Sequence, residues 1–148
     1  MLKNLPKEIP IFPLKGVIMF PQTILPLNIF EPRYVSMIED AIMTKHRLIG
    51  IIQPYQKNTK NLSTNIVGCL GRIISFEERN DNKYFITLKG ISRFKLLSEK
   101  ITKGGYFLSN ITLENFILDT EKSKDEKNFA YKNDKKMKIA LKNYFDLK

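Results

Sequence analysis

Two side chains that often take part in chemistry occur once each in this sequence, Cys69 and His46. A cysteine nucleophile needs a neighbouring base that raises its thiolate population. Cys69 lies in an apolar, strand-like stretch and His46 at the expected end of a helix, so neither residue has a local activation signal. A buried thiol and a helix-terminal imidazole explain both residues without catalysis.

The sequence also lacks the patterns that bind metals or nucleotides. One histidine and one cysteine cannot complete a tetrahedral zinc site, and the carboxylates do not have calcium-loop spacing. The phosphate-binding pattern G-x-x-x-x-G-K-[ST] does not occur. We therefore predict that the protein is not an enzyme and carries no cofactor and no metal.

The sharpest candidate for a binding site is the corner at residues 30–34, where an apolar run meets a predicted helix. Glu31, Arg33 and Tyr34 would offer two charges and an aromatic ring to a peptide in a groove, with Phe30 beside them. The alternative is structural. Glu31 would favour the helix N-terminus electrostatically, Arg33 would pair locally and Tyr34 would pack in the core.

A second candidate surface is a charged face on a predicted strand pair later in the chain. It could recognise a partner, or it could be a solvated face with cross-strand ion pairs worth under ~1 kcal/mol each. Its charged side chains are Arg72, Glu77, Glu78, Lys89, Arg93 and Lys95.

Five prolines divide the apolar segment at residues 9–34, which must position the first of these candidates. Each proline removes a backbone donor and fixes one dihedral angle, so neither a helix nor a central strand is expected to run through them. The runs between them are too apolar for a solvated linker. We expect short, bent strands that wrap a core, as at the rim of a small barrel. The prolines are Pro10, Pro13, Pro21, Pro26 and Pro32.

The next segments predict one helix and then a strand. Pro32 suits the first helical position, and apolar residues recur at helical spacing as far as Ile42, so the helix should end near residues 45–46. Residues 47–53 predict a short apolar strand, and the polar residues 55–65 predict a loop.

Residues 66–79 and 83–97 predict a hairpin that carries the charged face. In its second strand apolar and basic side chains alternate, which predicts a half-buried strand with a cationic outer edge. A last strand is expected at residues 106–116. Glycines interrupt the hairpin where a closing barrel needs bulges or bends: Gly68, Gly71 and Gly90.

We predict three parts in the chain: a barrel domain at residues 1–118, a charged linker at residues 119–133 and a C-terminal helix at residues 134–148. An apolar stripe on that helix could support an oligomer. The stripe consists of Met137, Leu141, Tyr144 and Phe145.

The chain is basic, with 25 Lys and Arg against 15 Asp and Glu and a net charge of +10. Residues 1–113 hold 16 of the basic and 8 of the acidic side chains, so the excess lies on the predicted barrel. This distribution is typical of a protein that meets a polyanion. A single cysteine and the absence of any long uninterrupted apolar run predict a cytoplasmic protein without a membrane segment.

Four segments, taken in order, resemble the N-terminal substrate-binding domain of Lon protease. The ending FEPRY of the first is similar to stand-alone bacterial members of that family. The resemblance implies an α+β protein with a PUA-like fold, a small antiparallel pseudo-barrel with one helix after the first strands and a C-terminal helix that begins a helical region. The segments are FPLKGVIMFPQTILPLNIFEPRY at residues 12–34, RLIGIIQP at 47–54, VGCLGRIISFEE at 67–78 and ITLKGISRFKL at 86–96.

The resemblance also implies a function, that of a non-catalytic recognition module linked to protein quality control. Its partners would be unfolded or extended protein segments or a partner protein, bound between barrel and helix or by strand addition at a sheet edge. The alternative is an RNA-binding PUA-like module, which the basic excess favours. The sequence lacks the arginine-rich or aromatic-interleaved stripe with which such modules read bases.

Overall fold

The structure, a computed structural model, describes residues 4–55 and 66–120. The predicted C-terminal helix and almost all of the predicted loop at 55–65 lie outside these residues. The described chain forms six strands, one α-helix and one 3-10 helix, which confirms the α+β class. The elements are β1 (Glu8–Pro13), β2 (Ile24–Ile29), α1 (Pro32–Met43), β3 (Leu48–Ile52), β4 (Val67–Arg79), β5 (Lys83–Ile101), β6 (Phe107–Thr112) and η1 (Glu114–Asp119).

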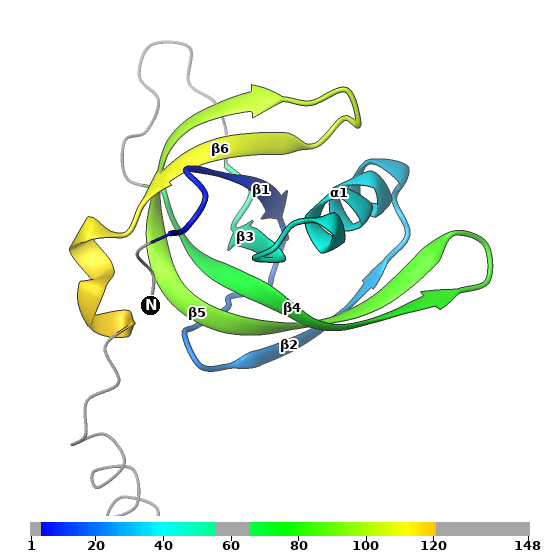
Figure 1. The fold of residues 1–148 in the computed structure, drawn as a ribbon, viewed down its shortest axis with the longest axis horizontal. Helices are drawn as coiled ribbons and strands as arrows, with labels where there is room; N and C mark the ends of the chain where they lie inside the picture. The colour runs from blue at the N-terminus through cyan, green and yellow to red at the C-terminus, as the bar shows by residue number, and fades with distance from the viewer. Residues whose placement is uncertain (1–3, 56–65, 121–148) are drawn as a thin grey trace, which may run out of the picture.

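Five of the strands close into a ring, and β2 pairs with β5 on the outside of it. The order is β2-β5-β4-β3-β1-β6, and an additional β5–β6 pairing joins the ends of the ring. Strand β5 makes this closure possible because its first half pairs with β2 and its last residues pair with β6. Figure 1 shows β5 curving along the barrel between these partners. The predicted pseudo-barrel is confirmed, although β1 and β3 run parallel while the other pairings are antiparallel.

A bulge lets β5 bury side chains on both faces of the sheet. Leu70 lies opposite Ser92 but Gly71 lies opposite Gly90, so β5 holds one extra residue, Ile91. Because side chains alternate along a strand, one inserted residue moves the following side chains to the other face. Leu88 therefore packs with α1. Phe94 packs in a second cluster, to which the ring strands contribute and which fills the barrel.

Helix α1 lies between the β4–β5 and β5–β6 hairpins (Figure 1). It buries the predicted apolar face and is tied to both hairpins by phenol hydroxyls. Tyr84 donates a hydrogen bond to Glu39 at 3.2 Å, and Tyr106 donates one to Asp40 at 2.6 Å. The helix ends at Met43, two residues before the predicted end. The buried residues are Tyr34, Met37, Ile38 and Ala41.

The prediction that no central strand tolerates the prolines is wrong for β1. This strand contains Pro10 and Pro13, yet it has a neighbour on each side. The two neighbours pair with different halves of β1: β6 pairs with residues Glu8 to Ile11, and β3 pairs with residues Ile11 to Pro13. Each proline therefore lies where only one side of the strand is paired, and its missing donor can point to the other side. In β2, Pro26 lies inside an edge strand, where a missing donor is tolerated.

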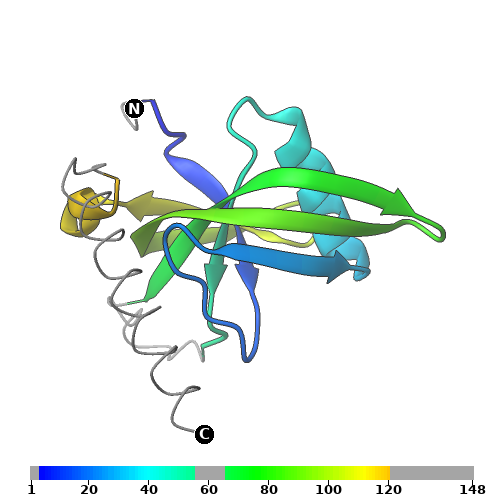
Figure 2. The same cartoon turned by 90° about the horizontal axis from the view of Figure 1, so that it is seen from below.

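The strand predicted at residues 106–116 is shorter than expected. Strand β6 ends at Thr112, and the chain then turns into η1. Asp119, the first residue of the predicted linker, belongs to η1 and is anchored to β5 by Arg93. Figure 2 shows η1 on the side of the barrel opposite α1.

Candidate functional site

The corner at residues 30–34 is largely closed by its own contacts. Tyr34 is buried, and its ring centroid lies 4.3 Å from that of Phe12. Burial raises the pKa of its phenol, and the positive charge of Arg33 partly opposes this increase. Arg33 lies 4.7 Å from the centre of the Tyr34 ring and forms a 3.2 Å ion pair with Glu31. Phe30 is 65% exposed, and Glu31 and Arg33 are about half exposed. These contacts favour the structural interpretation of the corner.

The cross-strand ion pairs predicted for the second candidate surface do not form among its charged side chains, all of which the structure describes. Arg72 lies opposite Lys89, a pair of like charges, while Glu77 and Glu78 lie opposite Phe85 and Tyr84. Among the residues that the structure describes, the ion pair formed within this hairpin joins Arg79 and Glu77 of the same strand at 3.8 Å.

Arg93 is engaged with η1 instead of forming part of a solvated face. Its Nε and terminal nitrogen donate to the two carboxylate oxygens of Asp119 at 2.9 and 2.8 Å, and its backbone N–H donates to the same group at 2.9 Å. Its guanidinium also lies 4.8 Å from the centre of the Phe116 ring. This hydrogen bonding lowers the pKa of Asp119 and raises that of Arg93. Arg93 thus anchors η1, a role that Arg72 does not share.

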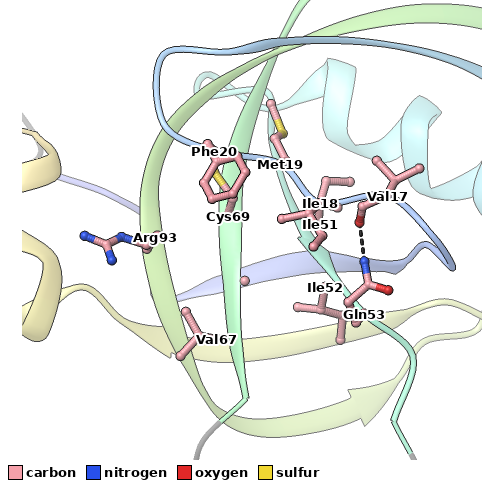
Figure 3. Close-up of a pocket in the computed structure, with 11 residues that line it drawn as sticks. Val17, Ile18, Met19, Phe20, Ile51, Ile52, Gln53, Val67, Cys69 and Arg93 are labelled. Carbon is pink, nitrogen blue, oxygen red and sulfur yellow. Dashed lines mark hydrogen bonds between the residues drawn. The ribbon is translucent and has the colours of Figure 1, made fainter.

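The described residues contain an open apolar hollow of about 150 Å³. It is lined by residues 17–20, 51–53 and 67–69 and by Arg93. We call it the hollow. Figure 3 shows the 17–20 segment along one side and Arg93 directed towards η1 on the other. Ile18 is 70% exposed and Phe20 59%, and Val67 is also exposed, so large apolar side chains border the opening.

The 17–20 segment is held at both ends. Gly16 has φ of 77°, a conformation that other residues rarely adopt, and it turns the chain after β1. At the other end Thr23 Oγ1 donates to Phe20 O at 2.6 Å, and Gly90 forms backbone hydrogen bonds of 2.9 Å with Gln22 and Thr23. A Cβ atom on Gly90 would lie 2.1 Å from Phe20 O, so this close approach requires glycine.

Polar groups in the hollow are few. The Gln53 side-chain amide donates to the carbonyl of Val17, which joins β3 to the 17–20 segment (Figure 3). Cys69 is buried at the base, and burial raises the pKa of its thiol to about 11, with Asp119 raising it further and Arg93 opposing. A thiol with so high a pKa is a poor nucleophile at neutral pH. The hollow is therefore suited to contact with apolar groups.

Sequence reasoning missed residues 17–20, although a signal for them was present. Val17, Ile18, Met19 and Phe20 form an apolar run bounded by Gly16 and Pro21. The run was assigned to short strands, but the structure gives it no strand pairing. Apolar residues between two breakers, too few to form an element, can remain exposed.

In the described part of the chain, no three His, Cys, Asp or Glu side chains gather in a group that could hold a metal ion. No helix there is long and apolar enough to cross a bilayer. The expected absence of cofactors and the cytoplasmic location stay predictions.

A family comparison identifies the class of protein that this fold represents. The model of the ATP-dependent protease La (LON) substrate-binding domain matches residues 8–147. The chain therefore belongs to the LON substrate-binding domain family.

Relatives agree with this assignment. Lon protease 2 of Sorangium cellulosum is 30% identical over 96 residues, which cover 62% of this chain and 12% of that protein. The Lon protease of Parabacteroides distasonis is 28% identical over 127 residues, covering 82% of this chain and 14% of that protein. The chain thus spans about one eighth of the length of these relatives.

Two solved structures share the fold. The Lon N-terminal domain protein from Xanthomonas campestris superposes with a TM-score of 0.56 at 24% identity, covering 71% of this chain and 58% of that one. The N-terminal domain of the Mycobacterium avium complex Lon protease gives 0.57 at 13% identity, covering 72% and 54%.

Proposed function

We propose that the protein is a non-catalytic recognition module that binds apolar side chains of unfolded or extended protein segments in the hollow. The family to which the chain belongs is a substrate-binding domain, which supports protein segments as the ligand class. The observation that carries the proposal is the exposure of Ile18 and Phe20 beside an apolar recess. A link to protein quality control follows from the same family membership.

The size of the hollow suits one side chain at a time. Apolar cavities of about 150 Å³ accept a group as large as benzene. An inserted leucine or phenylalanine would displace water from the exposed side chains Ile18, Phe20 and Val67, and burying one such inserted side chain is worth about 1.5–3 kcal/mol. Ordering of a flexible segment opposes this gain. We therefore expect weak binding of any single segment.

The test is binding of an unfolded protein whose cysteines are alkylated with iodoacetamide, followed by surface plasmon resonance. The double variant Ile18→Ser, Phe20→Ser should bind at least tenfold more weakly than the wild type, because both side chains border the hollow. The control Met43→Ser, Ile101→Ser removes two exposed apolar side chains elsewhere (86% and 68% exposed) and should bind normally. The proposal would be contradicted if both double variants lost affinity equally, or if neither lost affinity.

Nucleic acid is the second candidate ligand, and the like-charge pair Arg72 and Lys89 favours it. A polyanion would relieve the repulsion between these two exposed side chains. Titration with single-stranded RNA at increasing salt separates generic attraction from recognition. Binding that survives at about 150 mM salt with sequence preference would favour this candidate, and its loss in Arg72→Gln, Lys89→Gln would locate the RNA on this hairpin.

A further inference from the structure

We propose that the segment bound in the hollow is extended, pairs its backbone with residues 17–20, and carries acidic residues beside its apolar anchor. This inference rests on the proposed function and specifies its ligand class. It depends on three features of the described residues: backbone groups without partners, a side-chain pattern typical of a strand, and cations without ion pairs.

The backbone of the 17–20 segment has hydrogen-bonding capacity to spare. Among the hydrogen bonds of residues 4–55 and 66–120, none involves the N–H or the C=O of Ile18 or Met19. Val17 accepts from Gln53, and Phe20 is occupied by Thr23. Consecutive residues of an extended segment direct their backbone groups to opposite edges, so a ligand strand on one edge could pair with the unused N–H and C=O of either Ile18 or Met19, in the manner of strand addition.

The side chains of the segment alternate as they do in a strand with one buried face. Met19 is buried against the core, whereas Ile18 and Phe20 point to the outside. A strand laid beside this segment would therefore place every second side chain over the hollow. This geometry predicts recognition of an extended ligand, and it disfavours a helical one because a helix has no free backbone donors to offer along its length.

The charges around the hollow favour an acidic ligand. Lys95 lies opposite Val67, which lines the hollow, and Lys15 lies two residues before Val17. Neither lysine forms an ion pair in the part of the chain that the structure describes. Arg93 is already matched by Asp119. Aspartate or glutamate near the anchor would thus meet two uncompensated cations.

The charge preference is tested with ten-residue peptides that carry a central leucine in a serine and glycine background. One peptide has two glutamates on each side of the leucine, and the matched peptide has glutamines. Binding is followed by fluorescence anisotropy with a neutral dye. The glutamate peptide should bind roughly three- to tenfold more tightly, because each exposed charge contributes under about 1 kcal/mol. The difference should shrink as salt rises.

Protein variants locate this preference. Lys15→Gln, Lys95→Gln should abolish the difference between the two peptides, whereas Lys83→Gln, Lys103→Gln, with the same change in net charge at the distal hairpin ends, should retain it. A preference that persists in the first double variant would overturn the assignment of the cations to the hollow.

N-methylation of the peptide tests the backbone pairing. Methylating one amide at a time should weaken binding at alternate positions, because only every second N–H of an added strand points to residues 17–20. An effect that is equal at all positions, or absent at all of them, would overturn the pairing.

The two proposals fail in different ways. One outcome is that the leucine peptides bind the wild type but not Ile18→Ser, Phe20→Ser, and that their binding depends neither on glutamate nor on which amide is methylated. The hollow then remains the site, and this inference is wrong. If replacing the central leucine by serine leaves the binding of the glutamate peptide unchanged, the proposed apolar recognition is itself wrong.

Discussion

The corner at residues 30–34 and the 17–20 segment differ in how far their own chain covers them. Both contain large apolar or aromatic side chains and a proline within or beside them, and the corner adds the charges of Glu31 and Arg33. In the corner, Tyr34 is buried against Phe12, and Arg33 is held by Glu31. In the 17–20 segment, Ile18 and Phe20 stay exposed beside a recess.

The difference lies in what the rest of the chain supplies. Tyr34 lies in the first turn of α1 and packs its ring against Phe12 of β1, so residues that seemed suited to a ligand are used internally. The 17–20 segment is fixed at its ends by Gly16 and by the contact with Gly90, and its middle receives no strand. An apolar side chain becomes available to a ligand where the backbone is held but the side chain is not covered.

The largest expected effect separates the two regions by stability. Tyr34→Ala should lower the free energy of unfolding by about 3 kcal/mol or more, because it empties a buried aromatic site. Phe20→Ser should lower it by less than about 1 kcal/mol, because its side chain is mostly exposed. Urea unfolding followed by circular dichroism measures both. Equal losses would show that the 17–20 segment is as much part of the core as the corner.

The second prediction concerns the contact that holds the 17–20 segment. Gly90→Ala places a methyl group against the carbonyl of Phe20 and should cost about 2 kcal/mol while displacing the segment. Its cross-strand partner offers the matched control, because a Cβ on Gly71 meets only ordinary contacts at 3.4 Å. Gly71→Ala should cost under about 1 kcal/mol. Peptide binding should fall in the first variant only, and a normal affinity in Gly90→Ala would contradict the role of this contact.

The third prediction concerns the ion pair that anchors η1 beside the hollow. The pKa of Asp119 is lowered from 3.8 in the folded protein. Its contribution to stability is therefore complete above about pH 4 and is lost as the pH falls through the lowered value. Asp119→Asn should reduce stability at pH 7 by less than Gly90→Ala does.

The pH dependence supplies the control for Asp119. The gap in urea midpoint between the wild type and Asp119→Asn should narrow as the pH is lowered from 5 towards 2. A gap that stays constant over this range would show that the carboxylate charge is not what anchors η1.

The smallest effect is expected at the corner's surface ion pair. Glu31→Gln should change stability by under about 0.5 kcal/mol, since Glu31 and Arg33 are about half exposed and such pairs contribute little. The same urea titration measures it. A loss above about 1 kcal/mol would mean that the corner depends on this pair more than on the packing of Tyr34.

The sequence predicted the regular elements well because their signals are local. The helical spacing after Pro32 and the alternation in β5 each follow from a few neighbouring residues. The helix and the strand were confirmed, but the prediction of a single apolar face on β5 is wrong, because Leu88 and Phe94 pack in different clusters. The glycines Gly71 and Gly90 were also expected at a bulge, and they lie there.

The remaining features depend on contacts between distant segments. Inserting Ile91 changes the face on which β5 side chains lie, which no local pattern reveals. Arg93 looked like a solvated cation because its partner, Asp119, is 26 residues away in a segment that looked like a linker. The apolar run between Gly16 and Pro21 was a local signal, but the exposure of Ile18 and Phe20 also depends on which strands fail to reach them.

The most direct test of the account is an amide-resolved NMR titration of the isotopically labelled protein with the acidic leucine peptide. We expect chemical-shift changes concentrated at residues 17–20, 51–53 and 67–69, with little change at residues 30–34. Shifts that cluster at Phe30 to Tyr34 and leave residues 17–20 unchanged would contradict it.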